Sequence, residues 1–94
     1  MVAYVISLNE IRDEAAFAAY GALARRLTPL HGGRVLARGP GVALEGDDEP
    51  GRVLVIEFSN AQQATDFYRS TAYAEARRLR EGAGQVRLIL VDAQ

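Results

Sequence analysis

The chain has 94 residues, and its 11 basic and 12 acidic side chains give a formal net charge of −1. A chain of this length forms one domain, so we expect residues 1–94 to fold as a single unit. The balanced charge gives nucleic acid no general attraction, and the lack of cysteine excludes disulfide bonds and thiolate metal sites, which suits the cytoplasm.

The first predicted strand covers residues 2–8, where apolar side chains occupy both alternating faces. It ends at Asn9–Glu10 without a long apolar run, so we expect neither a signal peptide nor a membrane span. Asp13 is the predicted N-cap of the first helix, whose apolar side chains recur at helical spacing. Arg25–Arg26 are expected in the last turn of this helix, and Pro29 helps to end it.

The second predicted strand begins with residues 34–38. The segment Gly39-Pro40-Gly41 interrupts it, as a bulge or kink would. Residues 42–45 are expected to continue the strand, and an acidic turn follows them. Residues 52–58 form the third predicted strand.

Ser59 is the predicted N-cap of the second helical region, because Gln62 lies three positions further on, as in a capping box. Ser70 is expected to restart the helix, so this region is predicted in two pieces. Residues 85–92 form the last predicted strand. The order is βαββαβ, which indicates an α+β fold of the ferredoxin-like type, a four-stranded antiparallel sheet with the helices on one face.

The predicted strands are apolar on both faces, although helices cover only one face of such a sheet. In the third strand, for example, Leu54 and Ile56 alternate with Val55. The uncovered face holds about ten apolar side chains, each worth roughly 1.5–3 kcal/mol when buried. We therefore expect a second copy of the chain to cover this face and form a dimeric α/β barrel.

Several short segments of the chain recur, in this order and spacing, in a known bacterial family. They are His31-Gly32-Gly33-Arg34, Glu57-Phe58 and Ser70-Thr71-Ala72-Tyr73, together with Asp13, Phe17 and Tyr20. Over nearly its whole length the chain resembles the family named domain of unknown function thirteen-thirty, which belongs to the dimeric α+β barrel superfamily. One departure is Thr71, where members of the family often have proline.

The resemblance implies a homodimer with back-to-back sheets, and it implies no particular activity. The wider superfamily includes cofactor-independent monooxygenases, muconolactone isomerase, haem-degrading enzymes and stress-responsive proteins. Because one fold carries many functions, function must be argued from the residues of this chain.

Two residues are candidates for acid–base catalysis. His31 is the only histidine; histidine titrates near neutral pH and suits a general acid or base, but here it could equally bond backbone groups at the end of the first helix. Glu57 interrupts the apolar pattern of the third strand, so its carboxylate lies near an edge, pairs with an arginine, or faces a cavity where it could act as a base. The candidate partners are Arg34, Arg38 and Arg52.

Four further residues are candidates for ligand binding. Arg34 either clamps a carboxylate or forms a salt bridge at the surface or the rim of a dimer. Tyr68 and Tyr73 either line a pocket between helices and sheet or belong to the core. Ser70 lies beside them in the sequence, and its hydroxyl is equally expected to cap the helix that follows.

These residues are compatible with two kinds of function. In the first, a cytoplasmic homodimer converts a carbonyl or carboxylate metabolite by cofactor-free proton transfer, with His31 or Glu57 as the base. In the second, the dimer is non-catalytic and binds a small ligand or has a structural role. Haem handling through His31 is a third alternative.

We expect no cofactor and no metal, because one histidine without cysteine gives transition metals few ligands. The expected partners are a second copy of the chain and a small molecule. Neither nucleic acid nor a membrane is expected as a partner.

Overall fold

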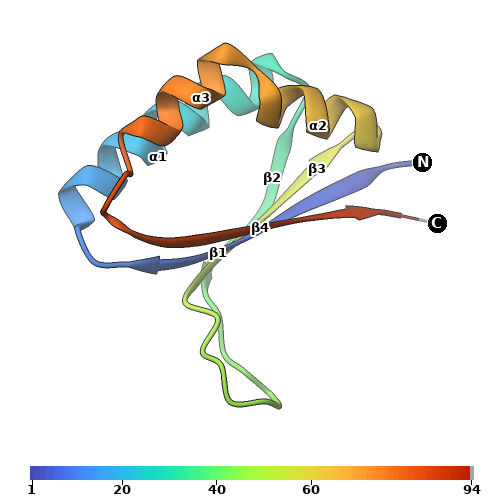
Figure 1. Ribbon diagram of the computed structural model, residues 1–94. Coiled ribbons are helices and arrows are strands. Elements are labelled where there is room, and N and C mark those ends of the chain that lie inside the picture. Colours follow the sequence, from blue (N-terminus) through green and yellow to red (C-terminus); the bar gives the residue numbers. More distant parts are fainter. Residues whose placement is uncertain (94) are drawn as a thin grey trace.

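The computed structural model describes residues 1–93, which form four strands and three helices. In chain order they are β1 (Ala3–Ile11), α1 (Glu14–Leu30), β2 (Arg34–Pro40), β3 (Arg52–Phe58), α2 (Ala61–Arg69), α3 (Thr71–Arg78) and β4 (Gly84–Asp92). The strands pair antiparallel in the order β2-β3-β1-β4. All three helices lie on one face of this sheet (Figure 1). The predicted ferredoxin-like α+β fold is confirmed, with the second crossover helix divided in two.

The register of the sheet decides which face each strand residue occupies, because residues directly opposite each other share a face. Ile56 pairs with Val5, and both pack in or against the core beneath the helices. Val55 pairs with Ile6, which in turn pairs with Ile89, so these three lie on the opposite face. Ile89 is 46% exposed there. The prediction that both faces of the strands are apolar is therefore confirmed; we call the face away from the helices the open face.

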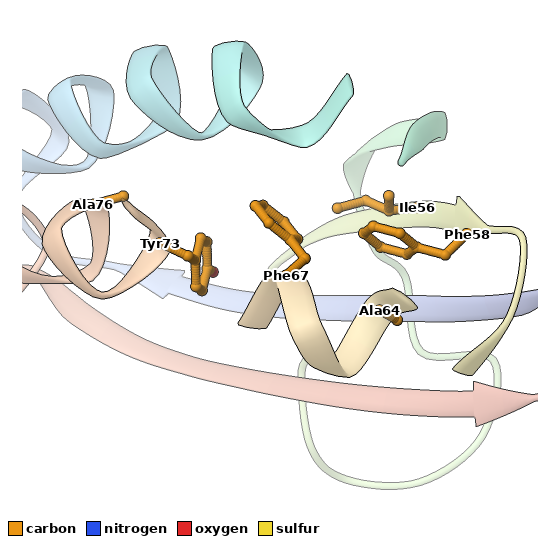
Figure 2. Close-up of a cluster of buried hydrophobic side chains, with 6 residues drawn as sticks. All are labelled: Ile56, Phe58, Ala64, Phe67, Tyr73 and Ala76. Carbon is orange, nitrogen blue, oxygen red and sulfur yellow. The ribbon is translucent and has the colours of Figure 1, made fainter. Parts of the chain in front are cut away.

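Buried aromatic side chains from α2, α3 and β3 form the centre of the core. Figure 2 shows Phe67 of α2 between Tyr73 of α3 and Phe58 of β3. The ring centroid of Phe67 lies 4.9 Å from that of Tyr73 and 5.7 Å from that of Phe58. Stacked and tilted aromatic contacts at these distances are favourable, so they fix Tyr73 against the sheet.

Helix α1 begins as predicted but runs further than expected. The carboxylate of Asp13 accepts the backbone N–H of Ala16 at 3.1 Å, which makes it the N-cap. The helix continues to Leu30 with Pro29 inside it, so the prediction that Arg25–Arg26 lie in the last turn is wrong. Pro29 is tolerated because the backbone N–H groups that follow it still bond to carbonyls of the preceding turn.

The predicted continuation of the second strand through residues 42–45 is wrong. Strand β2 ends at Pro40, and residues 41–51 form a loop closed by a 2.7 Å backbone hydrogen bond between its first and last residues. The returning half of this loop is acidic and contains a proline, so it offers no strand partner. The irregularity in β2 lies at Leu36, between residues 35 and 37, and not at Gly39-Pro40-Gly41 as predicted.

The two predicted caps in the second helical region have different outcomes. Ser59 is not the N-cap of α2: Asn60 accepts the backbone N–H of Gln63 at 2.7 Å, while the Gln63 side chain accepts the backbone N–H of Ser59 at 3.2 Å. Gln63 thus bonds to the residue before the N-cap, so the predicted capping box of Ser59 and Gln62 is wrong. Ser70 does restart the helix, because its hydroxyl accepts a backbone N–H of α3 at 3.1 Å and donates to a carbonyl of α2 at 2.8 Å.

Candidate functional site

A cleft of about 480 Å³ lies between the helices and the face of the sheet that they cover. We call it the tyrosine cleft, because Tyr20 of α1 and Tyr73 of α3 line it. Their hydroxyl oxygens lie 2.6 Å apart, within hydrogen-bond distance, and their ring centroids are 6.2 Å apart in an edge-on arrangement. A cleft of this size, with mostly apolar walls and a few polar groups, is typical of small-molecule sites.

The hydrogen bond between the two hydroxyls leaves one proton uncommitted. Each phenol carries one proton, so the tyrosine that accepts the bond keeps its own proton for another partner. Within residues 1–93, no acceptor other than the partner hydroxyl lies in hydrogen-bond range of Tyr20 or Tyr73. The pair can therefore donate to an oxygen atom of a ligand.

Tyr20 keeps its proton under ordinary conditions. Burial raises the pKa of Tyr20 well above its usual value, and the neighbouring hydroxyl of Tyr73 raises it further, against a smaller opposing effect of the Arg80 guanidinium. A tyrosine already neutral near pH 7 thus becomes harder to ionise. Tyr20 is accordingly a hydrogen-bond donor or acceptor in the cleft and not a phenolate.

Two buried polar side chains form part of the cleft floor. Ser7 and Asn9 of β1 are only 6% and 7% exposed and lie on the helix-covered face. The Ser7 hydroxyl donates to Asn9 Oδ1 at 2.9 Å, and Asn9 Nδ2 donates to the backbone oxygen of Arg52 at 3.1 Å. At the exposed edge of the cleft, Arg52 also pairs with Glu14 at 3.3 Å. The floor therefore carries polar atoms in an otherwise mostly apolar cleft.

A second hollow, of about 820 Å³, lies between α2, α3 and the edge strand β4. We call it the arginine groove, because four arginines but one glutamate line it: Arg69, Arg77, Arg78, Arg80 and Glu81. The groove adjoins the tyrosine cleft, since the two hollows share the wall residues Val5, Ala64, Tyr68 and Leu88. One side of the candidate site is thus aromatic and the other is cationic.

Two arginines of the groove are held against tyrosine rings. Arg77 donates from Nη1 to the Tyr68 hydroxyl at 2.9 Å, and its Cζ lies 4.7 Å from the centroid of the Tyr68 ring. The Cζ of Arg80 lies 4.9 Å from the centroid of the Tyr20 ring. These are cation–π distances. The rings therefore orient both guanidinium groups within the groove.

The positive charges of Arg77 and Arg80 are not neutralised by the described part of the chain. Their Nε atoms are buried and have no hydrogen-bond partner there. The salt bridges among residues 1–93 join other residues, Arg34 with Glu57 and Arg52 with Glu14. A guanidinium that forms no salt bridge keeps its positive charge for another partner, so these two side chains are suited to an external anion.

Of the residues predicted for the site, Tyr68 and Tyr73 line the tyrosine cleft, and Ser70 caps α3 beside them. His31 lies at the end of α1, where its Nδ1 donates to the Leu27 carbonyl at 3.0 Å. Its ring centroid lies 5.0 Å from that of Phe67. His31 lines neither hollow of the described chain.

Arg34 and Glu57 lie on the open face, away from the tyrosine cleft. They stand opposite each other on β2 and β3, and Arg34 Nη2 lies 3.1 Å from Glu57 Oε1. The prediction that Glu57 pairs with a nearby arginine is confirmed for Arg34. The Arg34 side chain is 72% exposed, so this salt bridge contributes little to stability.

The polar residues around the two hollows that were not predicted for the site include Ser7, Asn9, Tyr20, Arg77 and Arg80. Ser7 and Asn9 follow Val5 at alternate positions, which places polar groups on the covered face of a strand. Residues 73, 77 and 80 follow the i, i+4, i+7 spacing of one helical face. That spacing was the available signal that two arginines accompany Tyr73.

The fold defines the class of protein as a ferredoxin-like α+β domain, and similar solved structures share it. A protein of unknown function from Rhodopseudomonas palustris is 23% identical, with a TM-score of 0.79 over 99% of this chain and 82% of its own. A dimeric ferredoxin-like protein of unknown function from Jannaschia sp. CCS1 is 13% identical, with a TM-score of 0.75 over 99% of this chain and 100% of its own. Another dimeric ferredoxin-like protein of unknown function, from Thermobifida fusca YX, is 10% identical, with a TM-score of 0.68 over 99% of this chain and 92% of its own. At these identities the likeness shows the fold alone.

The family is identified from the sequence itself. The sequence model of the family Domain of unknown function (DUF1330) matches residues 2–94. The chain therefore belongs to this family, as the resemblance indicated. A search of curated proteins gives no match. In the described range 1–93, no helix has both the length and the apolar character that crossing a membrane requires.

Proposed function

We propose that the protein is a homodimer that binds a small, mostly apolar molecule with a carbonyl or carboxylate oxygen in the tyrosine cleft. The observation that carries this proposal is the Tyr20–Tyr73 hydroxyl pair, 2.6 Å apart in a cleft of about 480 Å³. Its uncommitted proton is a donor for the ligand oxygen, and the surrounding aromatic and aliphatic side chains bury the ligand body.

The cleft supports binding better than catalysis. A general base must lie within hydrogen-bond reach of the proton that it removes. Among the described residues that line the cleft, only Glu14 has a carboxylate. This carboxylate pairs with Arg52 at the exposed edge. His31 bonds to the end of α1, and Glu57 pairs with Arg34 on the opposite face of the sheet. Non-catalytic ligand binding is therefore the favoured function over proton transfer by His31 or Glu57.

The homodimer in this proposal is supported by the open face. Val55 shares this face with Ile89 and Val91, which are 46% and 42% exposed. A second copy would present the same apolar surface, as a two-fold interface requires. The loop of residues 41–51 also extends away from the helices (Figure 1), with Leu44 99% exposed. Two similar proteins are described as dimeric, which supports a homodimer.

Binding in the cleft can be tested with two probes of nearly the same shape, acetophenone and α-methylstyrene. Only acetophenone has an oxygen that can accept the tyrosine proton. We expect acetophenone to bind more tightly by at least several-fold, as expected for one hydrogen bond worth about 1 kcal/mol. NMR titration of the labelled protein should place the shift changes at Ser7, Asn9 and Tyr20.

The test variant is the double substitution Tyr20→Phe and Tyr73→Phe, and the control is Tyr4→Phe. Tyr4 lies on the open face, opposite Glu57, so its hydroxyl is outside the cleft. The double variant should abolish the preference for acetophenone, because a single remaining tyrosine would still have an uncommitted proton to donate. Tyr4→Phe should keep the preference. Equal binding of the two probes by the unmodified protein, or shift changes confined to other surfaces, would contradict the proposed function.

A further inference from the structure

We propose that the arginine groove binds the anionic group of an organic carboxylate whose apolar body lies along strand β4. The inference deepens the proposed function, because it names the class of ligand for the site that the groove and the tyrosine cleft form together. It rests on three features of the groove: its charge, the state of two guanidinium groups, and its apolar floor.

The charge of the groove favours an anion. Four arginines and one glutamate line it, whereas the whole chain carries 11 basic and 12 acidic residues. Positive charge is thus concentrated in one hollow of a chain that is nearly neutral overall. Low-dielectric walls strengthen the attraction of such a hollow for a negative ligand.

The two guanidinium groups nearest the tyrosines are oriented and lack an anionic partner. Arg77 is held by the Tyr68 hydroxyl at 2.9 Å, and Arg80 lies over the Tyr20 ring at 4.9 Å. The buried Nε atoms of both remain without a hydrogen-bond partner among residues 1–93. A guanidinium binds a carboxylate through two parallel N–H groups, which its terminal Nη atoms can supply.

The floor of the groove selects an organic anion over a mineral one. Val86, Leu88 and Leu90 alternate along β4 and pair with Asn9, Ser7 and Val5, so they face the helices. Inorganic phosphate has no apolar part to bury on this surface, whereas an aryl or alkyl chain does. The groove therefore fits a carboxylate at the end of an apolar chain.

The test compares 4-phenylbutyrate with its neutral amide, 4-phenylbutanamide, by isothermal titration calorimetry on the full chain. We expect the acid to bind at least about tenfold more tightly than the amide, the fold-change expected for one hydrogen bond to a charged group. Inorganic phosphate at equal concentration should not displace the acid.

The variants separate the groove from the rest of the molecule. Arg77→Gln and Arg80→Gln should each lose most of the preference for the acid, and Arg80→Lys, which keeps the charge but not the fork, should retain part of it. Arg26→Gln is the matched control, since Arg26 is exposed on α1 and lines neither hollow. Circular dichroism should show that all variants remain folded.

Equal binding of acid and amide, with no effect of the Arg77 and Arg80 variants, would overturn the carboxylate assignment. Displacement by phosphate would overturn the role of the apolar floor. If neither compound binds, the inference also fails. In each case the acetophenone measurement decides separately whether the proposed function of the tyrosine cleft stands.

Discussion

Val55→Asp is expected to dissociate the proposed homodimer. Val55 lies on the open face, where it pairs with Ile6 on one side and Ala37 on the other. In a two-fold interface each substitution acts twice, so losing two buried valines costs roughly 3–6 kcal/mol, and two desolvated carboxylates add several kcal/mol more. Even roughly 3 kcal/mol raises the dissociation constant of the dimer about a hundredfold.

Sedimentation velocity over a series of protein concentrations measures this dissociation constant. Val35→Asp is the matched control, because it places the same residue on the neighbouring strand β2 but on the face of Ile56, which the helices cover. Val35 is already 44% exposed, so the control should remain dimeric. A folded Val55→Asp protein with the dissociation constant of the unmodified chain would refute the reasoning, and so would an unmodified chain that is monomeric throughout.

Three further predictions concern stability. Ser70→Ala should lower the free energy of unfolding by about 1 kcal/mol in urea denaturation, because it removes the cap of α3; an unchanged midpoint would argue against the cap. Gly33→Ala should cost about 1–3 kcal/mol, since an added Cβ would lie 2.7 Å from Thr28 Cγ2, whereas Gly39→Ala, with nothing within 4 Å, should be near neutral in the same assay. Because burial raises the pKa of Tyr20 in the folded chain, the unfolded chain loses this proton first, and the free energy of unfolding should fall as pH rises past about 10. Tyr20→Phe should lose that part of the pH dependence. If the free energy of unfolding of this variant falls with pH as steeply as that of the unmodified chain, the prediction is contradicted.

The fold was predictable because its signals are periodic. Alternating apolar residues located four strands, and the capping residues Asp13 and Ser70 located two helix starts. Errors arose where two local preferences compete. The apolar residues of 42–45 suggested a strand, but a strand also needs a partner, and the acidic half of the loop provides none.

The site was less predictable, because it depends on how the faces and helices meet. Both faces of β3 are apolar, so the sequence alone did not indicate that Glu57 lies on the face without helices. Tyr20 and Tyr73 are 53 positions apart, and their hydroxyls meet only because α1 packs beside α3. Helical spacing could have placed Arg77 and Arg80 on the same face as Tyr73. Spacing does not reveal, however, whether an acidic partner lies near these arginines.

The central claim is that a ligand oxygen accepts the uncommitted proton of the Tyr20–Tyr73 pair. The most direct measurement is a crystal structure of the full chain with bound acetophenone. We predict a carbonyl oxygen at about 2.5–3.0 Å from one of the two hydroxyls, the usual range for O–H···O hydrogen bonds. Acetophenone bound elsewhere, or bound in the cleft with its oxygen turned away from both tyrosines, would contradict the claim.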